Sequence, residues 1–341
     1  MRLAIVAEKP SIVATYGRVL AEFYPDVDFS EVAVFHTKLA WFTGNRRFYF
    51  PRGLKWQDFP YVGDPVYRPI HIDATRPVKG IKGLSDRRVI SAEEGLKALH
   101  AADLILLIVD PCSRGIHLAA KFLGDHFDTV PWDRTLYPWT PDLTDNGMRR
   151  SLAGARRPDQ FAMPLISIGE NMRFFDFNYL VNSFALTGRS VMEEAGLRGP
   201  IPSKYGLQTL YDARETGELG DGYRIERMIR WRGTGKYDHD KYDGLGSPTS
   251  RGAIVEQLVK GGFLARVGPK TDVTDGGRRY LDLLHPNCLD SDLPFRIVDW
   301  SALPPPEARA KMTRYLRTFF GKQKTFTESR RKGVRLSHPS R

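Results

Sequence analysis

The chain has 341 residues, and its 41% hydrophobic and 11% aromatic content is that of a globular protein with one large core or two to three smaller ones. Lysine and arginine outnumber aspartate and glutamate by 51 to 40, a formal charge of +11, which favours a polyanionic partner, although a merely basic surface gives the same count. Two cysteines, Cys112 and Cys288, are too few for a disulfide framework or a zinc cluster, and the longest apolar run, residues 104–109, is too short to span a membrane.

The first 150 residues have the pattern of a parallel α/β sheet. Residues 3–6 form an apolar run that predicts a strand, and residues 12–20 carry apolar side chains at helical spacing. The same order returns as a short helix at 92–99, an apolar strand at 104–109 and a helix after Gly115. Unbroken apolar strands that alternate with helices predict a parallel sheet covered on both faces. No signal-peptide pattern precedes the first strand, so we expect a cytoplasmic protein.

Two carboxylates follow the two apolar strands. Glu8 and Asp110 each stand where a strand ends, at the edge where parallel sheets bind their ligands. Paired carboxylates at such an edge favour Mg²⁺, a hard cation that prefers oxygen ligands. The same positions also suit solvated loop residues or helix caps, and spacing alone does not decide between these interpretations.

Residues 151–303 predict a mainly helical region that ends in a smaller module. The stretch 151–194 is helical in pattern, and 223–231 is interpreted as a short strand. Between 249 and 284 a helix, a Gly-Gly turn, an apolar strand, a Gly-Pro turn and a second helix follow one another. This order suggests a winged-helix module.

Residues 304–341 are expected to form a basic helix and tail. From Glu307 onward the chain has eleven lysines or arginines and two acids, a net charge of +9. Residues 322–341 contain few large apolar side chains, so they are expected to be partly disordered until they meet phosphate or an acidic partner. Removal of everything after Gly321 should then weaken DNA binding without unfolding the protein.

Two segments at the strand ends resemble one known domain. Residues 5–11, Ile-Val-Ala-Glu-Lys-Pro-Ser, resemble the opening of the Toprim domain of type IA DNA topoisomerases. Residues 107–115, Leu-Ile-Val-Asp-Pro-Cys-Ser-Arg-Gly, resemble its second motif, whose family form is Asp-Pro-Asp-Arg-Glu-Gly-Glu. The resemblance implies a Toprim-like sheet in residues 1–150, with Glu8 and Asp110 as metal ligands and Lys9 and Arg114 as cations near the scissile phosphate.

Further motifs of the same enzymes follow in family order. Residues 244–251 are similar to Gly-x-Gly-Thr-Pro-Ala-Thr-Arg, 272–278 to Pro-Thr-x-x-Gly-Arg, 176–182 to Asp-Trp-Leu-x-Gly-x-Asn, and 207–209 to the Val-Gln-Thr of the gate hinge. The resemblance thus covers residues 3 to about 284. The DNA-binding residues that it and the neighbouring basic side chains imply are Arg173, Asp176, Asn182, Gln208, Ser247, Thr249, Ser250 and Arg251.

The chain also departs from the family at its chemical centre. The second metal-binding Asp is replaced by Cys112, a soft ligand, and the last acid of that motif falls on Ile116, which cannot bind a metal. The strand-passage domains that carry the nucleophilic tyrosine belong between Gln208 and Gly244, where only a short segment stands. Tyr211 is the one candidate nucleophile with a nearby arginine, although a tyrosine in such a helical pattern is more often a packing residue.

These observations lead to one function and two alternatives. We expect a topoisomerase IA-like protein that binds DNA, preferentially single-stranded, with weak Mg²⁺ binding, no zinc, no membrane partner and weak or no strand-passing activity, located at the nucleoid. One alternative is an active Mg²⁺-dependent topoisomerase or nicking enzyme that uses Tyr211. The other is a non-catalytic subunit of a replication or plasmid-transfer complex. Aromatics beside cations, at 173–175 and at Trp231 between Arg230 and Arg232, suit either base stacking or the core.

Overall fold

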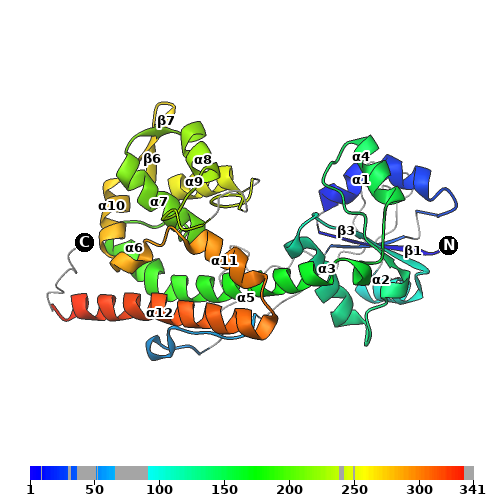
Figure 1. Cartoon of the computed structure of the whole chain (residues 1–341), viewed down its shortest axis with the longest axis horizontal. Helices are drawn as coiled ribbons and strands as arrows, with labels where there is room; N and C mark the ends of the chain where they lie inside the picture. Colours follow the sequence, from blue (N-terminus) through cyan, green and yellow to red (C-terminus); the bar gives the residue numbers. More distant parts are fainter. Residues whose placement is uncertain are drawn as a thin grey trace. The chain divides into compact units, whose positions relative to one another are not determined.

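The computed structural model describes residues 1–8, 10–29, 32–36, 51, 53–65, 91–237, 242–248 and 250–333. The chain divides into two compact units, Met1–Tyr49 with Val66–Arg173, and Phe50–Pro65 with Phe174–Arg341 (Figure 1). The boundary falls inside helix α5 (Met163–Ser183), so this helix contributes to both units. None of the helices in the described residues is both long and apolar enough to cross a membrane.

A parallel sheet forms the core of the first unit. Its described strands lie in the order β2-β1-β3-β4, and every neighbouring pair is parallel. The strands are β1 (Leu3–Ala7), β2 (Ala33–His36), β3 (Leu104–Ile108) and β4 (Thr135–Leu136). This confirms the predicted parallel α/β sheet. After β1 the chain crosses to β2 on one side, whereas after β3 it crosses to β4 on the other side. The gap between β1 and β3 is therefore the switch point where such sheets bind ligands.

Helices cover both faces of this sheet. The helices are α1 (Pro10–Phe23), α2 (Ala92–Ala101), α3 (Ser113–His126) and α4 (Asp145–Ala153). Successive strand residues point to opposite faces. Accordingly Leu3 and Ile5 pack with α1 and α4, whereas Ala4 and Val6 pack with α2 and α3. The two faces of β1 therefore bury two separate apolar clusters, which fixes the sheet between its helices.

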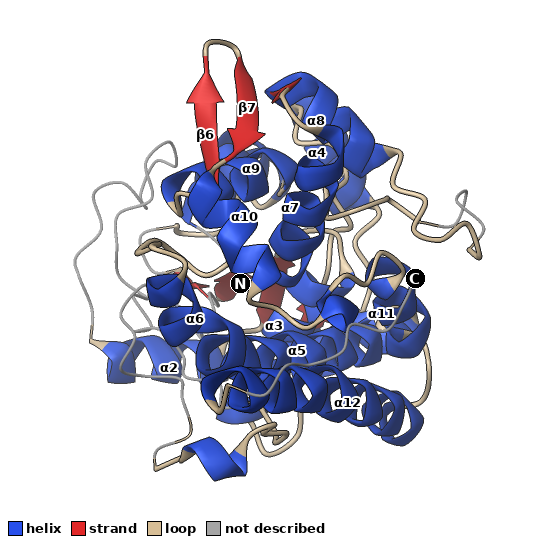
Figure 2. Cartoon of the chain, turned by 90° about the vertical axis from the view of Figure 1, so that its left-hand side faces the viewer, coloured by secondary structure: helices blue, strands red, loops and turns tan. Residues whose placement is uncertain are grey.

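The second unit contains the predicted helix, hairpin and helix. They are α9 (Arg251–Lys260), β6 (Leu264–Val267), β7 (Lys270–Val273) and α10 (Asp275–Asp282), and the hairpin stands out from the helices in Figure 2. A third short strand, β5 (Leu219–Gly220), pairs antiparallel with β7, so the sheet order is β5-β7-β6. The order of elements is confirmed, while the winged-helix assignment stays a prediction.

One predicted strand in this unit is wrong. Residues 223–231 were expected to be extended, but Asp221–Ile229 form helix α8. The buried side chains of this helix are Arg224 and Met228, one turn apart, while Tyr223 and Ile229 are exposed. Burial at a spacing of four residues is the pattern of a helix packed on one face. The buried Arg224 donates hydrogen bonds to Thr271 and Gly217, which joins α8 to β7.

Long helices complete the second unit. They are the second part of α5, a π-helical segment (Phe184–Gly188), α6 (Arg189–Glu194), α7 (Lys204–Thr216), α11 (Leu293–Ser301) and α12 (Pro305–Arg331). From Phe174 onward, α5 lies beside α12 (Figures 1 and 2). Rings of the two helices contact one another: Phe175 packs on Tyr315, and Tyr179 on Phe319 and Phe320. This aromatic layer is part of the unit's core.

The C-terminal helix corrects the expectation of a disordered tail. α12 continues to Arg331, and Gln323, Phe326 and Thr327 are buried along its last turns. The Gln323 side chain accepts a hydrogen bond from the His285 backbone, and Trp56 donates to Glu328 at 2.6 Å. The segment from Lys322 to Arg331 is therefore folded and packed, although its sparse apolar residues suggested otherwise. Residues 334–341 lie outside the described residues.

Candidate functional site

The two strand-end carboxylates lie together at the switch point of the first unit. Glu8 directly follows β1, and Asp110 stands two residues after β3, its parallel neighbour. The backbone N–H of Asp110 donates to Glu8 Oε2 at 3.3 Å, and the N–H of Glu8 donates to the Ile108 carbonyl at 3.2 Å. Both residues are half-buried. The structure thus brings these two predicted site residues into direct contact.

The start of α3 packs against the Asp110 peptide. A Cβ at Gly115 would collide with the Asp110 carbonyl oxygen, so only glycine allows α3 to begin this close to the strand end. Tyr137 donates a hydrogen bond to the same oxygen at 3.2 Å. Burial raises the pKa of the Tyr137 phenol well above its usual range, and the nearby Cys112 and Tyr16 act in the same direction. Tyr137 therefore keeps its proton and holds the Asp110 backbone in place.

The two residues that stand where the expected metal motif has acids, Cys112 and Ile116, have structural roles. Cys112 caps α3, because its Sγ accepts a hydrogen bond from the Gly115 N–H at 3.4 Å. Ile116 is fully buried in the apolar cluster between the sheet and α3. A glutamate at 116 would place a carboxylate in that cluster. Among the described residues no three His, Cys, Asp or Glu side chains form a group that could hold a metal ion. The described carboxylates at this edge are those of Glu8 and Asp110, and weak Mg²⁺ binding here stays a prediction.

We expect a Cys112→Asp substitution to make the stability of the protein respond to Mg²⁺. Aspartate is a strong helix cap, so the hydrogen bond from Gly115 is retained, and its carboxylate adds a third hard ligand beside Glu8 and Asp110. Ion binding to the folded state should then raise the free energy of unfolding by about 1.4 kcal/mol at tenfold the dissociation constant. Thermal melts of the variant with and without millimolar Mg²⁺ measure this change.

The matched control for that melt is Cys112→Asn. Asparagine caps the helix equally well but carries no charge, so its melting temperature should not depend on Mg²⁺. An equal Mg²⁺ response of the wild-type protein and of Cys112→Asp would show that Glu8 and Asp110 already bind the ion without a third carboxylate.

The remaining residues predicted for catalysis lie in different parts of the chain. Arg114 lies half-buried in the first turn of α3, two residues after the cap. Lys9 lies outside the described residues. Tyr211 belongs to the second unit, where it is 4% exposed within α7. Burial raises the pKa of its phenol well above the usual value, so Tyr211 is protonated at neutral pH. Its role as a nucleophile stays a prediction.

Several predicted DNA-binding residues hold the second unit together. Asn182 is fully buried, and its amide donates to the Tyr61 carbonyl at 2.6 Å and accepts from the Tyr61 N–H at 2.8 Å. The amide of Gln208, also fully buried, donates to the Cys288 carbonyl and accepts from the Asp290 N–H. Arg251 is 6% exposed and donates to the carbonyls of Leu245 and Asp243. In this conformation the three side chains pair with backbone groups.

The other predicted contacts are distributed over both units. Asp176 forms an ion pair with Lys204. Ser247 and Ser250 share hydrogen bonds in the turn before α9, and Thr249 lies outside the described residues. Arg173, in the first unit, lies close enough to His117 to lower the pKa of that imidazole. DNA contact by these residues remains a prediction. Phe174 and Phe175 are buried, so the core interpretation of residues 173–175 is the one that the fold favours.

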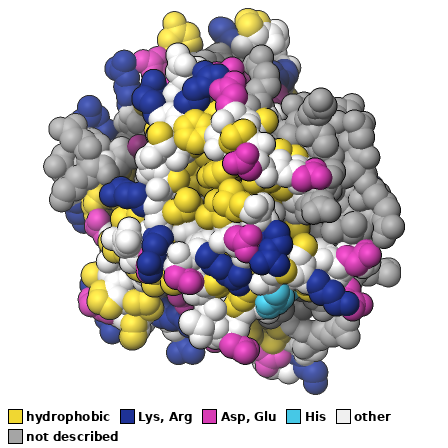
Figure 3. All heavy atoms as spheres, turned by 90° about the vertical axis from the view of Figure 1, so that its right-hand side faces the viewer, with side chains coloured by type: hydrophobic (Ala, Val, Ile, Leu, Met, Phe, Trp, Pro, Cys, Tyr) yellow, Lys and Arg dark blue, Asp and Glu magenta, His cyan; other side chains and the backbone are white. Residues whose placement is uncertain are grey.

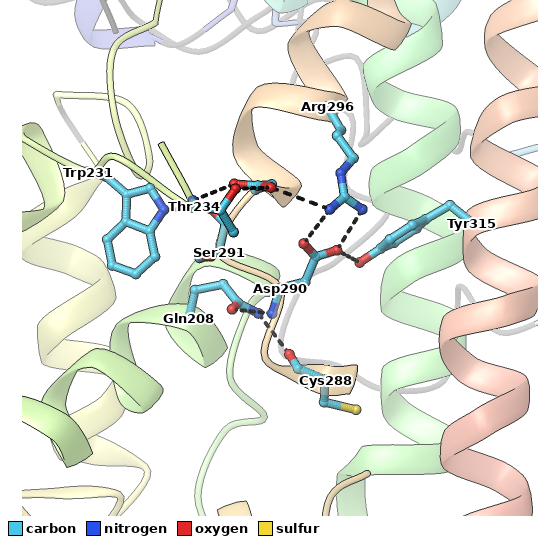
Figure 4. Close-up of polar contacts among 9 residues, drawn as sticks. Gln208, Trp231, Thr234, Cys288, Asp290, Ser291, Arg296 and Tyr315 are labelled. Carbon is cyan, nitrogen blue, oxygen red and sulfur yellow. Dashed lines mark hydrogen bonds and ion pairs between the residues drawn. The ribbon is translucent and has the colours of Figure 1, made fainter. Parts of the chain in front are cut away.

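A polar network that the sequence did not indicate lies beside α11 (Figure 4). Asp290 accepts two hydrogen bonds from Arg296 at 3.0 and 3.1 Å and one from Tyr315 at 2.8 Å. Its own N–H donates to the Gln208 side chain. Burial raises the pKa of Tyr315 well above the usual value, so the phenol acts as a donor. Apart from Gln208, no local pattern marks these residues, because they come from separate helices and a loop.

Neither a family model nor a curated protein matches this sequence.

Proposed function

We propose that this chain binds DNA, preferentially single-stranded, on a scaffold related to type IA topoisomerases, and has weak or no strand-passing activity. The exposed basic face of α12 carries the proposal. Over Pro305–Arg331 the helix has eight lysines or arginines and two glutamates. Lys311, Arg314, Arg317 and Lys322 are exposed, and helical spacing places Arg314 and Arg317 opposite the buried Met312, Leu316 and Phe319, with Lys311 and Lys322 on one flank of the helix.

This basic face is available to a polyanion. Lys311 pairs with Glu307 one turn away, but within the described part of the chain no acidic partner contacts Arg314, Arg317 or Lys322. From Lys311 to Lys322 the helix rises about 16 Å, enough for several backbone phosphates. By contrast, the face in Figure 3 mixes Lys and Arg with Asp and Glu around a hydrophobic patch. Net charge alone therefore does not locate the DNA, whereas α12 offers one sign of charge in a row.

The scaffold is proposed from the order of the motifs and from the switch-point carboxylates. The segment that stands in place of the family's strand-passage domains is short and packed: β5 joins the sheet, and Arg224 of α8 donates to Thr271 and Gly217. The metal ligand set at Glu8 and Asp110 is incomplete. A protein with this segment and this carboxylate pair is better suited to holding DNA than to cutting it and passing a strand.

Neutralisation of the α12 face tests the proposal. The triple variant Arg314→Gln, Arg317→Gln, Lys322→Gln should bind a fluorescent single strand more weakly, and its slope of log affinity against log salt should fall by about 2, since each lost phosphate contact removes roughly 0.7. The matched control is Lys97→Gln, Arg150→Gln, Arg189→Gln, whose side chains are 73%, 72% and 73% exposed and which changes the net charge equally. The control should keep the wild-type slope.

Three results would contradict the proposal. Equal losses in both triple variants would show that binding depends on total charge and not on α12. Mg²⁺-dependent relaxation of supercoiled DNA by the wild-type chain, lost in Asp110→Asn, would show an active topoisomerase. Salt-insensitive binding to a replication or transfer protein, without affinity for DNA, would instead indicate a non-catalytic subunit.

A further inference from the structure

The second unit contains a pocket of about 430 Å³ whose walls combine aromatic and basic side chains. This volume lies in the range of small-molecule sites. The pocket is lined by Tyr211, Asp212, Glu215, Arg227, Arg230, Trp231, Arg232, Gly233, Leu289 and Ser291. Most of these residues belong to α7, α8 and the turn that follows α8, so the pocket is built largely by the segment between Gln208 and Gly244.

The turn after α8 is fastened at both ends. The indole N–H of Trp231 donates to the Ser291 carbonyl at 2.7 Å (Figure 4). Three residues later, the N–H and hydroxyl of Thr234 donate to the Asp292 carboxylate at 2.7 and 2.8 Å. Between them Gly233 has a φ of +55°, and a Cβ there would collide with Asp292. The orientation of Trp231 is therefore set before any ligand arrives, which lowers the entropy cost of binding.

The cations of the pocket differ in availability. Arg227 is engaged by Asp212 through two of its nitrogens, at 2.6 and 2.9 Å. Arg230 pairs with Glu226 at a largely exposed position, where such pairs are weak. Arg232 is exposed, and among the described residues nothing forms an ion pair with it. Arg232 lies between the two fastened ends of the turn, next to Trp231, and is the cation best placed to meet an incoming anion.

We propose that this pocket binds one nucleotide, with the base stacked on Trp231 and the phosphate bound by Arg232, assisted by Arg230. An aromatic ring with an adjacent guanidinium matches a ligand that has a flat base and an anionic group. Asp212 and Glu215 on the pocket wall disfavour a bare inorganic anion, whereas a base can offer them its amino groups. If the nucleotide is part of a bound strand, this inference rests on the proposed function. If it is a free nucleotide, the inference is independent of that function.

Binding of two matched single strands, one with bases and one without, tests the inference. The probes are a fluorescent oligo(dC) and the same strand with abasic sites, measured by anisotropy, together with dCMP and inorganic phosphate in calorimetry. Wild-type protein should prefer oligo(dC) to the abasic strand by about tenfold or more. Trp231→Ala should remove this preference, and Trp231→Phe should keep most of it because the ring remains. Arg232 is exposed, so Arg232→Gln should leave the fold intact and should weaken binding of dCMP several-fold. Arg189→Gln should not weaken it.

The possible failures are distinguishable. If wild-type protein binds both strands equally and binds no dCMP, the pocket assignment is overturned while the proposed DNA binding stands. If neither strand binds but dCMP does, and Arg232→Gln loses it, the pocket is a free-nucleotide site and the proposed function fails. Phosphate that binds as tightly as dCMP would overturn the stacking role of Trp231.

Discussion

Deletion of residues 322–341 is expected to lower the free energy of unfolding by roughly 5 kcal/mol, because it removes the packed end of α12. Phe326 is 8% exposed, and loss of a buried phenylalanine alone costs about 3–5 kcal/mol. The His285 N–H loses its acceptor on Gln323, and the Trp56 indole loses Glu328. Urea titration followed by circular dichroism should show the loss, with a fall in melting temperature of about 10 °C or more.

The control for this deletion is removal of residues 334–341 alone. That shorter deletion leaves Gln323, Phe326 and Glu328 in place, so its unfolding curve should match that of the full chain. If the deletion from 322 melted within about 2 °C of the full chain, the last turns of α12 would contribute nothing to stability, and the disordered tail expected from composition would be the better description.

The C-terminal segment shows that composition alone does not reveal whether a polar segment is ordered by distant partners. Residues 322–331 contain a single large apolar residue, Phe326, so their polarity resembles that of a disordered segment. What orders them is a set of distant partners, Trp56 and His285, which are 272 and 38 residues away from the groups they contact. Local propensity was weakly informative here, and tertiary packing decided the structure.

The strand ends were predictable for the opposite reason. An unbroken apolar run marks a buried parallel strand by itself, and the residue that follows it must lie at the carboxyl edge of the sheet. Glu8 and Asp110 could therefore each be placed at that edge from sequence, whereas their contact follows from β1 and β3 being neighbours in the sheet. Helix α8 could not be predicted in this way, because one of its two buried residues is the charged Arg224. Arg224 is 2% exposed, and its guanidinium donates hydrogen bonds to Thr271 and Gly217.

Short motifs also do not separate structural polar residues from ligand-binding ones. Asn182 and Gln208 were predicted from short motifs to contact DNA, yet each amide pairs with one N–H and one carbonyl of a neighbouring backbone. A buried side-chain amide that pairs with buried backbone N–H and carbonyl groups stabilises the fold, whatever the protein binds. In contrast Trp231, for which stacking and the core were the two alternatives, packs on the cluster of Met228 and Leu245 and also lines the pocket, so its position is compatible with both roles.

Acidification from pH 7 is expected to destabilise the first unit through His117. This side chain is 5% exposed in α3. Burial lowers its pKa to about 4, and the cations Arg173 and Lys121 add to the effect, whereas a hydrogen bond to Ile166 opposes it. In the unfolded chain the pKa is about 6.5, so between pH 6.5 and 4 the unfolded state binds a proton that the folded state does not.

Stability should therefore fall as the pH falls through this window, by about 3 kcal/mol in total at pH 4, with about two-thirds of the loss complete at pH 5. His117→Gln keeps an amide N–H for the Ile166 carbonyl but cannot be protonated, so the variant should lose most of this slope. His126 and His285, whose pKa values burial also lowers, account for a remaining slope of the same sign.

Urea midpoints at pH 7, 6 and 5 measure the difference in slope between the wild-type protein and His117→Gln. The matched control is His100→Gln, which changes an exposed histidine of the same unit. If wild-type protein and His117→Gln lost stability equally between pH 7 and 5, the imidazole would not be held neutral in the fold, and the close packing of α3 on α5 at Gly169 would have to admit its charge.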